Sequence, residues 1–142
     1  MNKSQTLCVD ASIVIRLVMF PGDPILEIWN SWADQGSRLI APTLLYYEVV
    51  NGIYQYRKHN QIDDTLMDNA LTTVLTLPIN IIGATEIHLR AAQLATQIGL
   101  PATYDAHYLA LAERMAVDLW TADKRLVKTC QEHGLKWVNL IE

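Results

Sequence analysis

The segment TLCVDAS, residues 6–12, is the part of the sequence that decides the fold. Its four mainly apolar residues predict a short buried strand, and Asp10 follows that strand directly. Short strand-like segments alternate with helix-length segments through the rest of the chain, which predicts five strands at residues 6–9, 38–41, 79–82, 118–121 and 136–140. This alternation is typical of an α/β fold with a parallel sheet.

Capping residues predict where several helices begin and end. Helix starts are expected at Asp23-Pro24, Pro42-Thr43 and Asp63, and helix ends at Gly36, Gly99 and Gly134. Residues 60–78 form an amphipathic helical stretch without a reactive cluster. Because the sequence has no internal repeat, low-complexity tract or flexible linker, we expect residues 1–142 to form a single domain.

The composition excludes several classes of protein. With 142 residues, 51% of them hydrophobic and 18% charged, the chain is expected to be a compact globule and not a disordered one. No apolar stretch approaches the ~20 residues that span a bilayer, and Asp10 interrupts any secretory signal, so we expect a cytoplasmic protein. A net charge of −4 argues against nucleic-acid binding by bulk positive charge, which leaves a local basic rim or bound metal ions.

Two other kinds of site find no support. Cys8 and Cys130 are too few for a disulfide framework or a zinc site, and both are expected to be buried or half-buried. The six glycines fit neither the GxGxxG nor the GxxxxGK pattern, so nothing predicts a dinucleotide or P-loop site.

Two carboxylates follow predicted strands. Asp10 ends the strand at 6–9, and Asp123 lies two residues beyond the strand at 118–121, where a helix should begin. In an open parallel sheet the ligand crevice lies beyond the carboxyl ends of the strands, so both acids are candidate site residues. Asp123 also has an ordinary interpretation as a helix N-cap.

Two further acids lie on helix faces that are expected to point inward. Glu48 falls on the apolar stripe of the helix that begins near Thr43, where an unpaired carboxylate would be costly. It needs a cation or a salt bridge, for which Arg16 and Arg90 are the candidates. Asp105 heads the inward face of the next candidate helix, although an acid in a first helical turn also complements the helix dipole.

Four carboxylates converging in one cleft would repel each other strongly without counter-charge. Divalent cations with oxygen ligands, Mg²⁺ or Mn²⁺, would supply that charge. Two such ions can hold both the attacking water and the leaving oxygen of a phosphodiester. The acids therefore predict metal-dependent phosphodiester hydrolysis.

The motifs around these acids resemble those of PIN domains, and most closely those of VapC-type toxin ribonucleases. The resemblance rests on DAS at 10–12, PTLLYYEVV at 42–50, YDA at 104–106 and TAD at 121–123, and it covers nearly the whole chain. It implies a three-layer α/β fold, with a central five-stranded parallel sheet flanked by about seven helices.

The same resemblance implies an endoribonuclease that uses Mg²⁺, with Mn²⁺ as a substitute, and is held inactive by a cognate VapB-like antitoxin. A homodimer is also implied. By the same carry-over, the metal ligands and catalytic residues are Asp10, Glu48, Asp105 and Asp123. Ser12 and Thr121 match hydroxyl positions near the metal site, although a helix N-cap and a strand-end residue are equally good interpretations.

Other candidates carry weaker signals. Arg16, Lys124 and Arg125 form a possible basic rim for the RNA backbone or are ordinary solvated charges. His107 lies only two residues from Asp105 on one helix, so it should point to a different face. Apolar residues of the second helix, Ile25, Ile28, Trp29 and Trp32, most simply pack into the core.

Two alternative functions stay open at this stage. A phospho-acceptor signalling domain also carries an acid after its first strand, but it needs paired acids there and a late lysine at a strand end, which this chain lacks. A non-catalytic PIN-like module would keep the fold and bind only a protein partner. Four retained acids argue against the second alternative, because their repulsion is costly without a metal.

Overall fold

The protein, described here by a computed structural model, alternates strands and helices from residue 5 to residue 142. The strands are β1 (Thr6–Val9), β2 (Arg38–Pro42), β3 (Ile79–Ile82), β4 (Asp118–Thr121) and β5 (Val138–Leu140). The helices are α1 (Ala11–Met19), α2 (Ile25–Asp34), α3 (Leu44–Lys58), α4 (Asp64–Thr76), α5 (Glu86–Ile98), α6 (Tyr104–Met115) and α7 (Lys124–Glu132). None of these helices is both long and apolar enough to cross a membrane.

All five strands in residues 5–142 pair in parallel, in the order β3-β2-β1-β4-β5. The chain runs outward from β1 to β2 and β3, and then returns to place β4 on the other side of β1. The strand order therefore reverses between β1 and β4. Such a reversal point is where open α/β sheets bind their ligands, at the carboxyl ends of the strands.

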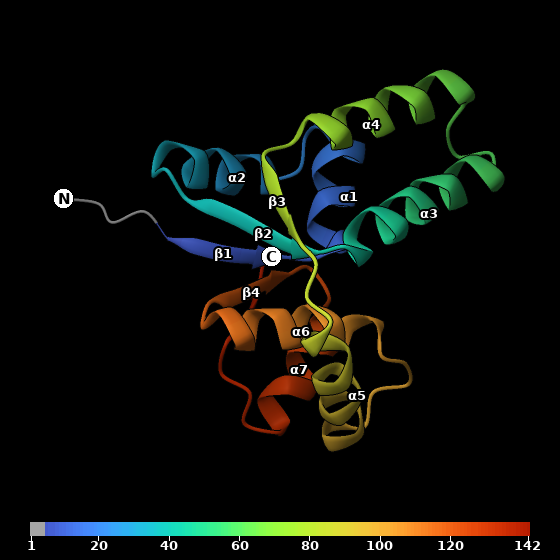
Figure 1. Cartoon of the computed structure of the whole chain (residues 1–142). Coiled ribbons are helices and arrows are strands. Elements are labelled where there is room, and N and C mark those ends of the chain that lie inside the picture. Colours follow the sequence, from blue (N-terminus) through green and yellow to red (C-terminus); the bar gives the residue numbers. More distant parts are fainter. Residues whose placement is uncertain (1–4) are drawn as a thin grey trace.

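Helices cover both sides of the sheet, as Figure 1 shows, with α1 to α4 on one side and α5 to α7 on the other. Side-chain alternation in β1 explains why both faces are buried. Leu7 and Val9 pack in one cluster with Trp29 and Trp32 of α2, whereas Cys8 packs in a second cluster that contains residues of α3 and α4 as well as α5 and α6. The predicted fold class, including its seven helices, is confirmed.

Most predicted strand boundaries agree with the structure, and the two that differ have simple causes. Strand β2 continues to Pro42 because this residue pairs with Ile82 of β3. Strand β5 begins at Val138, two residues later than predicted, because its register aligns Val138 with Leu119, one residue into β4. Residues before Val138 therefore have little of β4 to pair with.

The predicted helix signals act as expected at most positions. The side chain of Asp63 accepts a hydrogen bond from the backbone N–H of Leu66, and that of Asp23 accepts one from the N–H of Ile25. Glycines at the ends of three helices adopt positive φ, namely Gly36, Gly99 and Gly134. The predicted burial of the α2 tryptophans and of both cysteines is also confirmed.

Candidate functional site

Asp10 lies at the junction between β1 and α1, and its side chain is only 5% exposed. It is the N-cap of α1, because its Oδ1 accepts a hydrogen bond from the backbone N–H of Ile13 at 3.3 Å. The Ser12 hydroxyl donates to Oδ1 and the Thr121 hydroxyl donates to Oδ2, each at 2.5 Å. The carboxylate is thus held in one orientation by three hydrogen bonds.

The two hydroxyls also bind the backbone that follows β4. Ser12 Oγ accepts the N–H of Ala122 at 2.9 Å, and Thr121 Oγ1 accepts the N–H of Asp123 at 3.0 Å. Ser12 is therefore not the N-cap of its helix, which corrects one of the two interpretations given above. Together these bonds connect the end of β4 to the start of α1 on either side of the reversal point.

Asp123 is exposed and caps the N-terminus of α7, as its ordinary interpretation predicted. The backbone N–H groups of Arg125 and Leu126 donate to the side chain at 2.9 and 3.2 Å. Both of these bonds use Oδ1. The cap therefore leaves Oδ2 for another ligand, and the structural and functional interpretations of Asp123 are compatible.

Glu48 is half-buried on α3, and its partner is a tyrosine and not an arginine. The hydroxyl of Tyr108, which is fully buried on α6, donates to Glu48 Oε1 at 2.6 Å. The two arginines considered above are bonded elsewhere, Arg16 to Asp23 at 2.7 Å and Arg90 to Glu113 at 2.6 Å. The predicted alternative of a salt bridge from Glu48 to either arginine is therefore wrong.

Asp105, in the first turn of α6, is the centre of the negative charge. Burial, together with the neighbouring charges of Asp123 and Glu48, raises its pKa from an ordinary 3.8 to about 6. Burial likewise raises the pKa of Asp10 to about 6, against the opposing hydrogen bonds, with a contribution from Asp105. All three other acids therefore interact electrostatically with Asp105. We call this set, Asp10, Glu48, Asp105 and Asp123, the acidic cluster.

The donor set of the acidic cluster fits a hard divalent cation, because it consists of carboxylate oxygens alone. Within residues 5–142, however, no three His, Cys, Asp or Glu side chains are close enough together to hold a metal ion. Binding would therefore require the carboxylates to approach each other, and Glu48 can keep its hydrogen bond to Tyr108, which uses only Oε1. A cation would offset the repulsion that raises the pKa of Asp105.

The candidate basic rim is only partly available. Arg16 is held by Asp23 and also donates to the carbonyl of Ile141 at 3.4 Å. To bind an RNA phosphate it would have to leave these partners. Lys124 and Arg125 are exposed beside Asp123, at the start of α7. The predicted roles of these three residues stay predictions.

Two contacts near the acidic cluster were not apparent from the sequence. Tyr108 contacts Glu48, and it lies one helical turn beyond Asp105, a spacing that could have suggested a shared face. His107 contacts His88 of α5, with His88 Nδ1 and His107 Nε2 3.0 Å apart. The histidines line a cavity of about 410 Å³, which we call the α3–α6 pocket.

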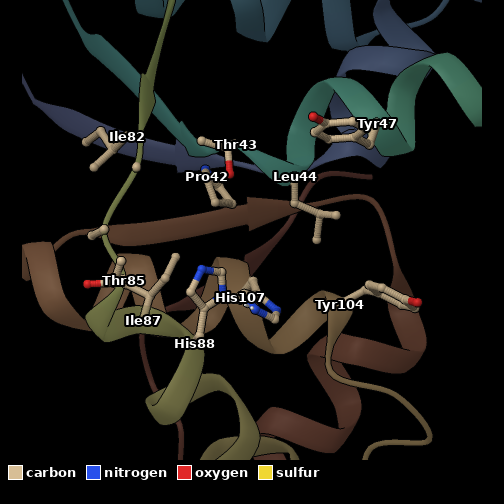
Figure 2. Close-up of a pocket in the computed structure, with 12 residues that line it drawn as sticks. Pro42, Thr43, Leu44, Tyr47, Ile82, Thr85, Ile87, His88, Tyr104 and His107 are labelled. Carbon is tan, nitrogen blue, oxygen red and sulfur yellow. Dashed lines mark hydrogen bonds between the residues drawn. The ribbon is translucent and has the colours of Figure 1, made fainter.

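The α3–α6 pocket lies where α3, α5 and α6 begin, beside the end of β2. In Figure 2 the rings of His88 and His107 lie opposite Pro42 and Thr43. Two tyrosines, Tyr47 and Tyr104, lie along one side of it (Figure 2). Each tyrosine immediately precedes an acid of the cluster in the sequence, so the pocket adjoins the candidate site.

We predict that the metal-free protein becomes more stable as the pH falls from about 7 to about 5. The pKa values of Asp10 and Asp105, about 6 in the fold, exceed the ordinary value of 3.8. The folded protein therefore binds protons more tightly than the unfolded chain does. This stabilisation is complete below the ordinary pKa and is lost as the pH rises through about 6.

Melting temperatures of EDTA-treated protein across this pH range would test the prediction. The hydrogen bonds from Arg16 and Arg90 lower the pKa values of Asp23 and Glu113 from their ordinary values of 3.8 and 4.5. The stability that these two groups contribute is therefore lost only near and below those pH values. The chosen range avoids them. A melting temperature that stays constant or falls on acidification would contradict the raised pKa values.

Comparisons with known proteins place these observations in context. Residues 7–132 match the sequence profile of the family described as PIN domain. Among curated protein sequences, none matches the chain.

Several solved structures share the fold at low sequence identity. VapBC2 of Rickettsia felis, bound to a promoter DNA fragment, superimposes with a TM-score of 0.73 at 13% identity, covering 96% of this chain and 99% of the other. VapC20 of Mycobacterium tuberculosis, described as a toxin that cleaves the sarcin-ricin loop, gives 0.64 at 12% identity over 86% and 93%. A toxin–antitoxin complex from Klebsiella pneumoniae gives 0.63 at 23% identity over 94% and 95%.

Proposed function

The chain belongs to the PIN-domain family, whose members are typically metal-dependent nucleases, and on this basis we propose that it is a metal-dependent endoribonuclease. It would hydrolyse RNA phosphodiester bonds as the toxin of a type II toxin–antitoxin pair. The fold supports this proposal, because structural neighbours include toxins and toxin–antitoxin complexes.

One observation carries the proposal: three carboxylates interact electrostatically with Asp105 at the carboxyl end of the sheet, and no arginine side chain of residues 5–142 is bonded to any of the four. Burial and the neighbouring carboxylates raise the pKa of Asp105 to about 6. Arg16 and Arg90, the two arginines predicted as possible partners of Glu48, are paired with Asp23 and Glu113 instead. An acidic cluster whose described members form no salt bridge is the arrangement that a divalent cation stabilises.

We assign the acidic cluster as the ligand set for Mg²⁺, with Mn²⁺ as a substitute. Such ions activate water and offset the charge of the scissile phosphate. Asp10 is held for this role by Ser12 and Thr121, and Asp123 presents its unbonded Oδ2 from the start of α7. Tyr108 donates to Glu48 and keeps this carboxylate turned toward α6.

We also propose a protein partner, a VapB-like antitoxin, and a homodimer. Similar structures include complexes of toxins with antitoxins. The chain itself exposes apolar side chains along α3, at Tyr47, Val50 and Tyr54. A contiguous exposed apolar face is typical of a protein interface.

Binding of the metal can be tested by its effect on stability. We expect Mg²⁺ or Mn²⁺ to raise the melting temperature and EDTA to reverse the change. At a hundred times the dissociation constant, a ligand specific for the folded state adds about 2.7 kcal/mol, an effect of several degrees. The same preparation, free of antitoxin, should cleave single-stranded RNA of mixed sequence only when the metal is present.

Two results would count against the proposal. If neither ion stabilises the protein and no RNA is cleaved, the chain is better described as a PIN-like module that binds a protein partner. If RNA is cleaved equally well in EDTA, the activity does not use a divalent cation and the assignment of the acidic cluster fails.

A further inference from the structure

We propose that the α3–α6 pocket binds one base of the RNA substrate, next to the bond that is cut, and so gives the enzyme a preference for sequence or for unpaired bases. The inference rests on the proposed ribonuclease function and adds a specificity subsite to it. It is carried by the position of the pocket, the chemistry of its lining and the hydrogen-bonding state of its two histidines.

The position of the pocket follows from two neighbouring pairs of residues. Tyr47 precedes Glu48 on α3, and Tyr104 precedes Asp105 on α6. Consecutive residues on a helix diverge by about 100°, so each helix presents an acid to the cluster and a tyrosine to the pocket. An RNA strand with a phosphate at the acidic cluster would therefore place an adjacent base at the pocket.

The chemistry of the lining suits a base better than a phosphate. Among the described residues that line the pocket, none is a lysine, arginine, aspartate or glutamate. The tyrosine rings are available for stacking, since Tyr47 is 76% and Tyr104 59% exposed. Unpaired RNA bases are recognised by stacking on aromatic rings and by hydrogen bonds to their edges.

The two histidines supply a hydrogen-bond acceptor for a base edge. His107 Nδ1 lies 2.7 Å from the carbonyl oxygen of Thr103, which can only accept, so we assign the proton to Nδ1. In the neutral ring, His107 Nε2 then accepts from His88 Nδ1 at 3.0 Å. His88 is left with an acceptor at Nε2, which can receive an N–H from a base.

The most direct test removes the base from the RNA and, separately, the tyrosine rings from the pocket. A single-stranded RNA with one defined cleavage site would be made as a series, with an abasic residue at each position around the scissile bond. For the wild type we expect kcat/KM to fall about 10-fold at one position and to change little elsewhere. For Tyr104→Ala and for Tyr47→Ala, we expect kcat/KM on the intact RNA to be about 10-fold lower than for the wild type. An abasic residue at the sensitive position should then lower kcat/KM little further.

Tyr54→Ala is the matched control, because Tyr54 is an exposed tyrosine on α3 that does not line the pocket. It should keep the wild-type response to the abasic series. The sedimentation of each variant should be measured as well. If Tyr47→Ala and Tyr54→Ala both dissociate an oligomer while neither alters the response to the abasic residue, the occupant is another protein chain and the proposal is overturned.

Binding measurements separate failure of the pocket from failure of the proposed function. Fluorescence anisotropy would compare intact and abasic RNA with the wild type in EDTA, where no cleavage is expected. Base-dependent binding that is lost in Tyr104→Ala supports the pocket even if no cleavage is found under any condition. The opposite result is cleavage by the wild type in which an abasic residue lowers kcat/KM equally at every position, with the same pattern in the tyrosine variants. It would overturn the proposed base-binding pocket and leave the ribonuclease proposal intact.

Discussion

The Asp105→Asn variant is expected to lose RNA cleavage by at least about 100-fold and to melt at a higher temperature than the wild type when metal is absent. Asp105 interacts with every other member of the acidic cluster, so its charge affects all of them. Asparagine keeps the shape of the side chain but removes a ligand charge. It also removes a carboxylate whose pKa is raised to about 6, mainly by burial.

The gain in stability follows from that pKa. Near neutral pH the charged carboxylate of Asp105 is less favourable in the fold than in the unfolded chain, and asparagine removes this cost. Because the side chain is half-buried and solvent screens it, we expect roughly 1 kcal/mol, or about 4 °C. Calorimetry in EDTA and an RNA cleavage assay in Mg²⁺ would measure the two effects.

Asp68→Asn is a suitable control, because Asp68 is an exposed acid on α4, outside the acidic cluster. It should leave both the activity and the melting temperature close to those of the wild type. Full activity in Asp105→Asn would remove Asp105 from the proposed chemistry. A lower melting temperature would mean that its carboxylate has a stabilising partner, which contradicts the repulsion inferred here.

The double substitution Ser12→Ala and Thr121→Val is expected to weaken binding of Mn²⁺ by about 10- to 100-fold near neutral pH. Both hydroxyls donate to the Asp10 carboxylate, and these bonds lower its pKa against the effect of burial. Without them the pKa of Asp10 should rise above about 6, so that protons compete with the metal. Isothermal titration calorimetry at several pH values would measure the change.

Two features of this experiment make it specific. The loss of affinity should shrink as the pH rises, because the carboxylate then ionises without the hydroxyls. Thr73→Val is the control, since Thr73 is an exposed threonine whose hydroxyl binds only the carbonyl of Asn69 on its own helix. Unchanged metal affinity in the double variant, with its fold verified by circular dichroism, would show that the two hydroxyls have only a structural role.

Hydrophobic patterning was sufficient to predict the fold class and part of the candidate site, whereas the three-layer arrangement with seven helices was predicted from the family resemblance. The alternation of short strands and helices predicted a parallel sheet, and a parallel sheet brings residues that follow different strands to the same edge. Asp10 and Asp123 could be proposed on that basis before any coordinates. Their positions on either side of the reversal between β1 and β4 agree with this reasoning.

Contacts between different helices could not be predicted in the same way. Periodicity shows which face of one helix is buried, but not which residue of a second helix lies against it. The sequence therefore predicted that Glu48 needs a partner and suggested arginines, whereas the structure supplies the hydroxyl of Tyr108, sixty residues away. The pairing of His88 with His107 was missed for the same reason.

The order of the strands also determines when the candidate site can form during protein synthesis. β1 and β4 are neighbours in the sheet, although β2 and β3 lie between them in the chain. Until the segment beyond α6 has been translated, the nascent chain carries only three of the four acids, and it lacks the Thr121 hydroxyl that orients Asp10. A chain that has not yet reached β4 therefore has an incomplete site and, under the function proposed above, is not expected to cleave RNA during its own synthesis.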